Sequence, residues 1–403
     1  MQKFVSIKYI LFGFLVVLIG IGVTYSSNLY RLYTAVTLYD EDKITQNFLT
    51  LYESFNANEI PASQAPYTFP KKLSNLPETF SVENETFDVQ SFLAESGTTG
   101  FLVIKSGDIV FENYYQGHRE DRQHISWSVG KSFLSGMFGI AIDEGYIKSI
   151  EQSVTDYVPE LVGTGYDNVR IKDVLQMSSG VEFNEDYGDF NSDINRFSRA
   201  VALGTSLDDF SASLKRGREP GTYHHYVSID TQVLGMVLTR ALDVSLSDYL
   251  QTKIWEPMGM EHSTYWLKDD EGMELALGGL NVTLRDYAKF GWLYANGGNW
   301  NGKQLVPAQW VKDSVTPDAQ HLMPGFDNPN SSSASGYGYQ WWIPVGADDE
   351  FAAQGIYHQY IYIDPDKQLV IVKNSANHLY NEKSYQWGAK HYALFREIER
   401  HYR

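Results

Sequence analysis

The chain has 403 residues, of which 43% are hydrophobic and 14% are aromatic. This length allows a large core, and we expect one two-lobed unit behind an N-terminal extension. The net charge is −18 and no run is rich in lysine or arginine. A nucleic-acid partner is therefore disfavoured, because phosphate binding depends on clustered cations. Cysteine is absent, which excludes thiol catalysis, disulfides, thiolate zinc sites and a lipidated N-terminal cysteine.

The N-terminus carries the pattern of an export signal or a membrane anchor. Lys3 and Lys8 precede an apolar run from Tyr9 to Val23. With its neighbours the run approaches the ~20 residues that span a bilayer, and no A-x-A cleavage site follows. We expect residues 1–26 to anchor the chain in a bacterial inner membrane, with the bulk in the periplasm or outside the cell. Cleavage would instead give a secreted protein.

Residues 27–84 are predicted to connect this anchor to the main domain at 85–403. Residues 27–55 carry apolar side chains at loosely helical spacing, which favours one or two amphipathic helices. Residues 57–84 contain four prolines, so we expect an extended linker that wraps the domain surface.

The main domain is predicted to be an α+β fold with an antiparallel sheet flanked by helices. Residues 100–112 form one hairpin around a Ser-Gly-Asp turn, and residues 359–372 form another around Asp-Pro-Asp. Residues 150–316 are predicted to be a mostly helical lobe between the strands. Strand character returns at 337–342, and residues 384–403 favour a helix.

The most informative short pattern is Ser128-Val129-Gly130-Lys131, at the start of a largely apolar helical run. Residues at i and i+3 share a helix face, so the hydroxyl and the amine would lie together. Apolar surroundings lower the pKa of a lysine toward that of a usable base, which activates serine as a nucleophile. The alternative is that Ser128 caps the helix while Lys131 extends to water.

Tyr226-Val227-Ser228 offers a proton relay for such a pair. It follows a Pro-Gly-Thr turn and precedes a predicted helix, so the tyrosine would lie at a loop mouth. The pattern is weak alone, because four other tyrosines satisfy it: Tyr25, Tyr52, Tyr166 and Tyr294. A half-buried ring with a hydrogen-bonded hydroxyl is the alternative.

Ser-x-x-Lys, a Tyr-x-Ser about a hundred residues later and a late glycine-bearing strand resemble the penicillin-recognising serine hydrolases. The similarity is to class C β-lactamase-like members, and among these to 6-aminohexanoate-dimer hydrolases and related esterases. It covers residue 87 to the C-terminus. It implies that Ser128 is the acylated nucleophile and Lys131 the base or its electrostatic aid. Tyr226 would pass a proton to the leaving group and later activate water.

The third family motif, Lys- or His-x-Gly on an edge strand, is matched by Ala353-Gln354-Gly355, which lacks the cation. In β-lactamases and transpeptidases the cation helps to hold a substrate carboxylate. Its loss argues against a dedicated β-lactamase and favours neutral esters or amides. The resemblance also implies an oxyanion hole formed by the N–H groups of Ser128 and Ile356, with Gly355 beside the substrate.

Two further residues are matched more loosely. Tyr187 corresponds to a substrate-contacting loop tyrosine of the amide-hydrolysing relatives, and a packed loop aromatic is the alternative. Asn281 corresponds to a polar pocket residue, and a helix N-cap before 284–287 is the alternative. We expect no metal and no cofactor, because His224 and His225 would point oppositely on a strand and no H-E-x-x-H occurs.

The sequence therefore predicts a membrane-anchored serine hydrolase that cleaves small esters or amides through an acyl-enzyme on Ser128. The alternatives are a D-amino-acid peptidase, a transpeptidase or a β-lactamase of the same fold, or a non-catalytic binding or sensor module. The joint presence of Ser128, Lys131 and Tyr226 disfavours a pure binding module, which has no need of all three.

Overall fold

The computed structural model describes Tyr9, Phe12 and residues 26–403. The predicted membrane anchor at 1–26 therefore lies almost wholly outside the described residues. Among the residues that are described, no helix is long and apolar enough to cross a membrane.

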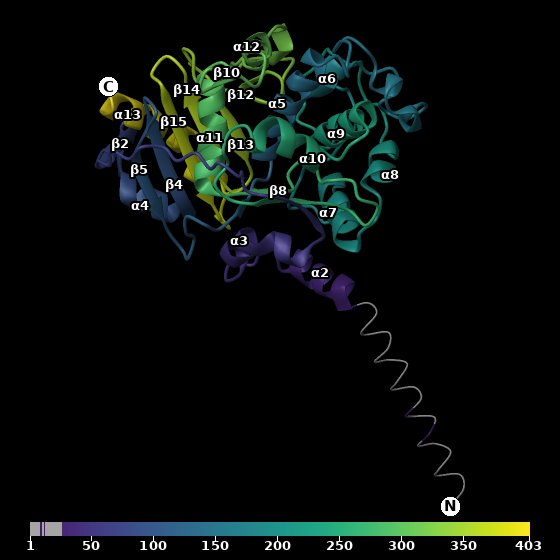
Figure 1. Cartoon of the computed structure of the whole chain (residues 1–403), viewed down its shortest axis with the longest axis horizontal. Coiled ribbons are helices and arrows are strands. Elements are labelled where there is room, and N and C mark those ends of the chain that lie inside the picture. The colour runs from purple at the N-terminus through teal and green to yellow at the C-terminus, as the bar shows by residue number, and fades with distance from the viewer. Residues whose placement is uncertain (1–8, 10–11, 13–25) are drawn as a thin grey trace, which may run out of the picture.

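A seven-stranded antiparallel sheet forms one side of the domain (Figure 1). In spatial order its strands are β11 (Gly336–Tyr337), β12 (Trp342–Ile343), β13 (Phe351–Gly355), β14 (Gln359–Asp364), β15 (Leu369–Ser375), β4 (Thr98–Lys105) and β5 (Asp108–Tyr114). Both predicted hairpins are confirmed, as β4–β5 and β14–β15. The predicted strand at 337–342 is wrong in one respect: the chain reverses at Gln340, whose φ is +64°, and forms two short paired strands.

Helices cover both faces of this sheet. Along β4, Leu102 and Ile104 pack into the main core, whereas Phe101 and Val103 pack into a second cluster. This alternation follows from the two-residue period of a strand. The main-core face is covered by α11 (Leu284–Ala295), and the other by α4 (Val89–Glu95) and α13 (Trp387–His401). A small hairpin, β2 (Thr79–Val82) and β3 (Glu85–Asp88), lies beside α13.

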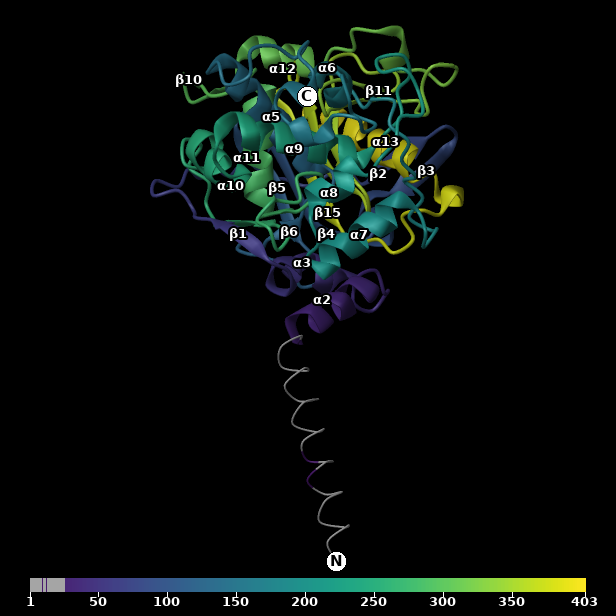
Figure 2. The same ribbon diagram turned by 90° about the vertical axis from the view of Figure 1, so that its right-hand side faces the viewer.

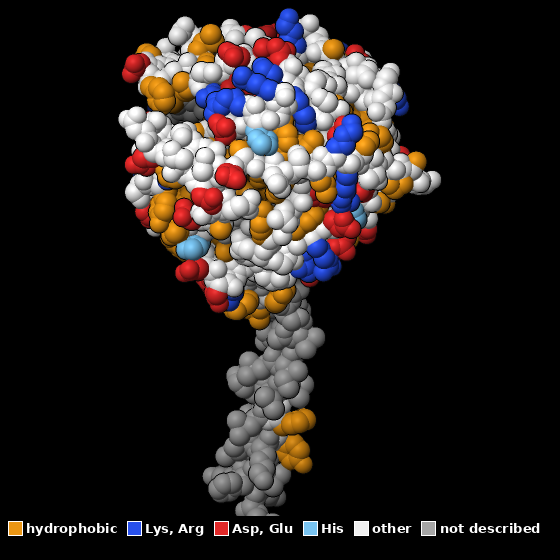
Figure 3. All heavy atoms as spheres, turned by 90° about the vertical axis from the view of Figure 1, so that its left-hand side faces the viewer, with side chains coloured by type: hydrophobic (Ala, Val, Ile, Leu, Met, Phe, Trp, Pro, Cys, Tyr) orange, Lys and Arg blue, Asp and Glu red, His pale blue; other side chains and the backbone are white. Residues whose placement is uncertain are grey.

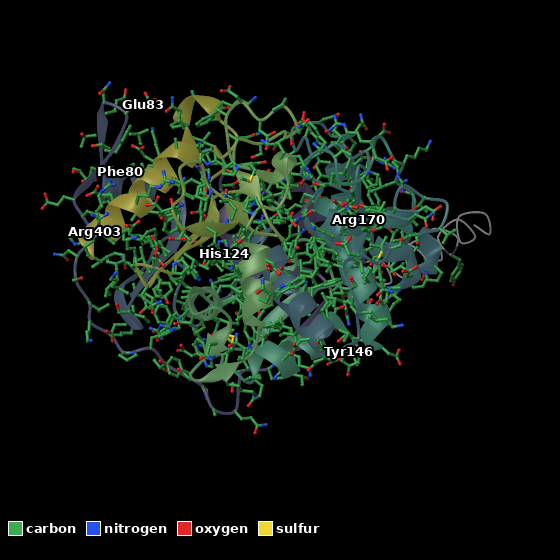
Figure 4. The ribbon with its side chains drawn as sticks, turned by 90° about the horizontal axis from the view of Figure 1, so that it is seen from above. Phe80, Glu83, His124, Tyr146, Arg170 and Arg403 are labelled. Atoms are coloured by element: carbon green, nitrogen blue, oxygen red, sulfur yellow. The ribbon has the colours of Figure 1, made fainter. Side chains whose placement is uncertain are left out.

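The helical lobe lies beside the sheet, and in it α9 packs against α5, α6 and α8. Figure 4 shows Arg170 and Tyr146 on this side of the domain, and Phe80 and Arg403 on the opposite side. The helices are α5 (Val129–Asp143), α6 (Ile171–Leu175), α7 (Asp193–Leu203), α8 (Leu207–Ala212), α9 (Ser228–Leu242), α10 (Leu246–Leu250) and α12 (Ala308–Ser314). Single 3-10 or π turns occur at Val154–Asp156, Pro159–Leu161, Gln251–Trp255, Gln320–Leu322 and Lys383–Tyr385, and a small hairpin joins β9 (Asn299–Trp300) to β10 (Lys303–Gln304).

Residues 26–60, which precede the predicted domain, form two helices and a strand that pack onto it. α2 (Ser26–Val36) packs against α7 at the base of the domain (Figure 2), and Arg31 donates to Asp270 at 2.8 Å. α3 (Ile44–Ser54) buries Phe48 completely. β1 (Ala57–Ile60) joins a second sheet of order β1-β7-β8-β6, with β7 (Thr264–Leu267), β8 (Leu280–Val282) and β6 (His124–Ile125). These segments therefore pack against the predicted domain.

On the face shown in Figure 3, acidic and basic side chains are interspersed. Apolar side chains reach the surface at several places on this face, including its lower end. The exposed apolar residues of α2 include Leu29, Tyr30, Tyr33 and Val36.

Candidate active site

Ser128 lies at the N-cap of α5, three residues after strand β6. Trp127, just before it, has φ of +43°, a left-handed backbone conformation that bulky residues rarely adopt. Gly130 allows a close approach, because a Cβ there would lie 2.9 Å from Ser126 Oγ. Strained backbone of this kind persists where the surroundings fix it, often at functional sites. The side chain of Ser128 makes no capping hydrogen bond, so it is not used as a helix cap.

Lys131 follows one helical turn later and is buried, with 1% of its surface exposed. Its Nζ donates to the carbonyl of Leu277 at 2.5 Å and lies 5.6 Å from the centre of the Tyr226 ring. Burial lowers the pKa of Lys131 from 10.5 to about 7, and the nearby carboxyls of Glu185 and Asp230 oppose the shift. Lys131 therefore does not extend to water, and a large part of it is neutral near pH 7.

Tyr226 lies in the loop before α9, as the sequence predicts. Its ring stacks on Trp342 at 5.2 Å between centroids. Burial raises the pKa of Tyr226 well above 10, and hydrogen bonds with the hydroxyls of Ser128 and Ser228 partly oppose the rise. The structure thus brings Ser128, Lys131 and Tyr226 together, with the phenol protonated at neutral pH.

Glu185 joins this group and was not anticipated from the sequence. Its carboxylate accepts hydrogen bonds from the Ser228 N–H at 3.1 Å, the Ser228 hydroxyl at 2.5 Å and the Tyr187 hydroxyl at 2.9 Å. Negative charge at the start of α9 is stabilised by the helix dipole. Glu185 is the largest charged influence that raises the pKa of Lys131, so it favours the protonated amine.

Asp230, in the first turn of α9, is a second unanticipated acid. It is fully buried and accepts a hydrogen bond from the Tyr166 hydroxyl at 2.8 Å. Burial raises the pKa of Asp230 to about 8, while hydrogen bonds from Tyr166 and Ser179 and the charge of Lys131 oppose the rise. Burial therefore favours the neutral forms of both Asp230 and Lys131.

The end of β13 forms the other edge of the site. A Cβ on Gly355 would lie 2.9 Å from the Ser126 carbonyl oxygen, so glycine is needed for this strand to approach the turn before α5. Ile356 begins the loop that leads to β14. Among the described residues, neither the Ile356 N–H nor the Ser128 N–H donates to a protein acceptor. Both remain available for the predicted oxyanion hole.

Ala353 does not line the site. It is 1% exposed and packs into the main core, whereas its neighbour Gln354 borders a cavity beside Ser128. Adjacent strand residues point to opposite faces, so a single strand cannot present both side chains to the substrate. The missing cation at Ala353 therefore does not determine the substrate charge, which depends on the residues that do line the cavities.

Of the two loosely matched residues, Tyr187 lies at the site and Asn281 does not. Tyr187 borders the space around Ser128, and its hydroxyl is held by Glu185. Asn281 lies on β8, is fully buried and donates to the carbonyls of Tyr265 and Gly279. It borders neither cavity, and Thr283 is the residue that caps α11. Both proposed roles for Asn281, in the pocket and as a helix cap, are therefore wrong.

Two cavities meet at Ser128, Tyr187 and Ile356. The larger cavity has a volume of about 550 Å³ and is lined mainly by apolar side chains, among them Leu32, Val36, Leu51, Ile194, Phe197 and Leu277. The smaller cavity has a volume of about 320 Å³ and is bordered by, among others, Glu185, Tyr226, Trp342, Gly355, Tyr380 and Trp387. A carbonyl carbon bound to Ser128 would therefore have space on two sides.

The histidines near the site are held by the protein. His224 bonds the Ser331 hydroxyl at 2.9 Å and stacks on Tyr337, and His358 packs against His391 and Trp387. Within residues 26–403 and the two earlier described positions, no group of three or more acidic or histidine side chains is arranged to hold a metal.

Comparisons with known proteins show which proteins this chain is similar to. Over 296 residues the chain is 30% identical to 6-aminohexanoate-dimer hydrolase of Paenarthrobacter ureafaciens, covering 72% of this chain and 75% of that protein. The solved structure "Putative 6-aminohexanoate-dimer hydrolase from Bacillus anthracis" has a TM-score of 0.81 at 24% identity, covering 90% and 95% of the two chains. A penicillin binding protein from Bacillus halodurans has a TM-score of 0.57 at 17% identity, covering 74% and 99%.

These two structural similarities are too low in sequence identity to show more than a shared fold. The family model described as Beta-lactamase matches residues 89–391, which is most of the chain and includes Ser128, Lys131 and Tyr226. The chain therefore belongs to the beta-lactamase family of serine hydrolases.

Proposed function

We propose that the protein hydrolyses small esters or amides through an acyl-enzyme on Ser128. The observation that carries the proposal is the buried Lys131, one helical turn after Ser128, whose pKa is lowered to about 7. A lysine in this state accepts a proton at neutral pH, which is what a serine hydroxyl needs to become a nucleophile. The relative named 6-aminohexanoate-dimer hydrolase supports a hydrolytic reaction.

Acylation starts when Ser128 Oγ attacks the substrate carbonyl carbon and its proton passes to neutral Lys131 Nζ. The carbonyl oxygen becomes an oxyanion, which the N–H groups of Ser128 and Ile356 stabilise. The Tyr226 hydroxyl donates a proton to the leaving oxygen or nitrogen as its bond to carbon breaks. Tyr226 then regains a proton from Lys131, so both groups return to their starting states.

Deacylation uses the same groups with water as the nucleophile. Water adds to the acyl carbon, and its proton passes through Tyr226 to Lys131. The bond between the acyl carbon and Ser128 Oγ then breaks, and Lys131 returns the proton to the serine. The carboxylic acid product leaves, and the free enzyme is restored.

The smaller cavity favours leaving groups without negative charge. Of the described residues that border it, Glu185 is the acidic one and none is a lysine or arginine. Glu185 would repel a substrate carboxylate at this position. Neutral alcohols and amines are therefore the expected leaving groups, rather than the free carboxylates of cell-wall peptides.

The proposal is tested with a panel of short p-nitrophenyl esters, linear amides and nitrocefin, each assayed with wild type and with Ser128→Ala. We expect hydrolysis of esters or amides that is lost in Ser128→Ala. Turnover that persists in this variant, or turnover of nitrocefin alone, would contradict the proposed reaction.

We also propose that residues 1–26 anchor the enzyme in the membrane, on the basis of their apolar run and flanking lysines. Cell fractionation of the full chain tests this, with a variant that begins at residue 26 as control. Recovery of both chains in the soluble fraction would contradict an anchor.

A further inference from the structure

The larger cavity is lined mainly by apolar side chains, which the proposed reaction alone does not require. It begins at Ser128 and extends between the N-terminal helices and α7. Leu32, Val36 and Leu51 form the wall on the side of α2 and α3. Ile194 and Phe197 form the opposite wall on α7. Its volume of about 550 Å³ lies within the range of pockets that hold small organic ligands.

Two of the polar side chains along this cavity, Asn195 and Ser198, are already engaged by the protein. Asn195 donates to the carbonyls of Tyr187 and Asp189 at 3.1 and 2.8 Å. Ser198 donates to the carbonyl of Ile194 at 2.9 Å. The cavity therefore offers few hydrogen-bonding groups to a ligand away from Ser128.

Among the described residues that line the cavity, Arg199 is the one lysine or arginine. It too is engaged by the protein. The guanidinium of Arg199 lies 4.1 Å from the centre of the Phe190 ring and donates to the Phe190 carbonyl at 2.7 Å. Phe190 itself is 70% exposed and Val36 is 74% exposed, so the cavity has apolar side chains at its surface as well as inside. An apolar ligand fits such a lining better than a charged one.

The position of the proton relay decides which part of the substrate enters which cavity. Tyr226 borders the smaller cavity and does not border the larger one. Since Tyr226 protonates the leaving group in the proposed reaction, the leaving group has to lie in the smaller cavity. The acyl group, on the other side of the carbonyl carbon, is then directed into the larger cavity.

On the basis of this proposed function, we infer that the larger cavity is an acyl-chain pocket and that the preferred substrates carry a linear aliphatic acyl chain. Each methylene that enters the pocket leaves water, which favours binding by up to about fourfold. The N-terminal helices supply one wall, so substrate selection depends on residues 26–55 as well as on the catalytic domain. Arg31 holds α2 in place through Asp270.

The pocket is tested with p-nitrophenyl esters from acetyl to dodecanoyl, which vary the acyl chain and keep the leaving group constant. For the full chain we expect kcat/KM to rise about two- to fourfold per methylene, and at least about fiftyfold between acetyl and octanoyl, until the pocket is filled. In Ala35→Trp, whose new ring would occupy the pocket from α2, we expect the octanoyl-to-acetyl ratio to fall at least tenfold.

Leu29→Trp is the matched control, because Leu29 lies on the same helix, is 58% exposed and does not line the cavity. It should keep the wild-type ratio. If Ala35→Trp does not fold, Ser198→Trp narrows the same pocket from α7, where Ser198 is exposed. Two results would overturn the acyl pocket but leave the proposed function. One is Ser128-dependent turnover that does not rise with chain length, and the other is an unchanged octanoyl-to-acetyl ratio in the folded pocket variant. Absence of Ser128-dependent turnover with every ester and amide would overturn both.

Discussion

Replacement of Lys131 by methionine removes the amine while keeping a long unbranched side chain. In wild type the pKa of Lys131 is lowered from 10.5 to about 7. At pH 7 about half of the lysine is then neutral, against about one part in 3,000 for a lysine with a pKa of 10.5. We therefore expect log kcat/KM for a neutral ester to rise with a slope of one below pH 7 and to level off above it.

The assay follows product by chromatography between pH 5 and 9, so that the readout does not depend on the titration of a chromophore. Lys131→Met should lower kcat/KM by about 10²–10⁴-fold and abolish the inflection near pH 7. Lys373→Met is the matched control, since Lys373 is a second fully buried lysine whose pKa burial lowers and which borders neither cavity. A flat profile, a profile that still rises with a slope of one at pH 9, or near-normal turnover by Lys131→Met would refute Lys131 as the base.

The same pKa shift has a consequence for stability. Because the pKa of Lys131 is lower in the folded chain, the unfolded chain binds more protons between pH 7 and 10.5. Lys131 therefore lowers the free energy of unfolding by an amount that grows as pH falls through this window, by about 1.4 kcal/mol per pH unit. The stability advantage of Lys131→Met over wild type in urea unfolding should be larger at pH 7 than at pH 9. An advantage that does not change with pH would contradict this.

The other predictions concern the groups around Ser128 and the N-terminal helices. Tyr226→Phe should keep the fold, measured by circular dichroism, and lower kcat by about 10²–10⁴-fold, and near-normal ester hydrolysis would exclude its role in proton relay. Glu185→Gln keeps one of the two acceptor oxygens but removes the charge that raises the pKa of Lys131, so the inflection should move to lower pH. The exposed Glu182→Gln should leave it in place, and an unmoved inflection in Glu185→Gln would contradict the coupling. Arg31→Ala should lower the free energy of unfolding by about 1–3 kcal/mol in a urea titration, and an unchanged midpoint would mean that α2 is held by its apolar contacts alone.

Local patterns made much of the fold predictable from the sequence. The two main hairpins follow from alternating apolar residues around short polar turns, and the structure confirms both. The helix after Ser128 and the loop position of Tyr226 follow from similarly local signals. These features depend on neighbours within a few residues, which a single sequence displays directly.

Features that depend on distant segments were not accessible in this way. In the sequence Glu185 and Asp230 do not differ from other acidic residues. Only the approach of their segments to α5 brings them near Lys131. The burial of Asn281 could not be predicted for the same reason, because it depends on neighbouring strands in the second sheet. The apolar spacing of 27–55 indicated helices, but not that their apolar face covers a cavity at Ser128.

The most direct test of the account is to trap the covalent intermediate on Ser128. The enzyme is mixed with a slowly hydrolysed octanoyl ester, quenched in acid and analysed by intact mass and peptide mapping. We predict one octanoyl group per chain, located on the peptide that contains Ser128 and absent in Ser128→Ala. Turnover by wild type with acylation at another residue, or with undiminished activity in Ser128→Ala, would contradict the central claim.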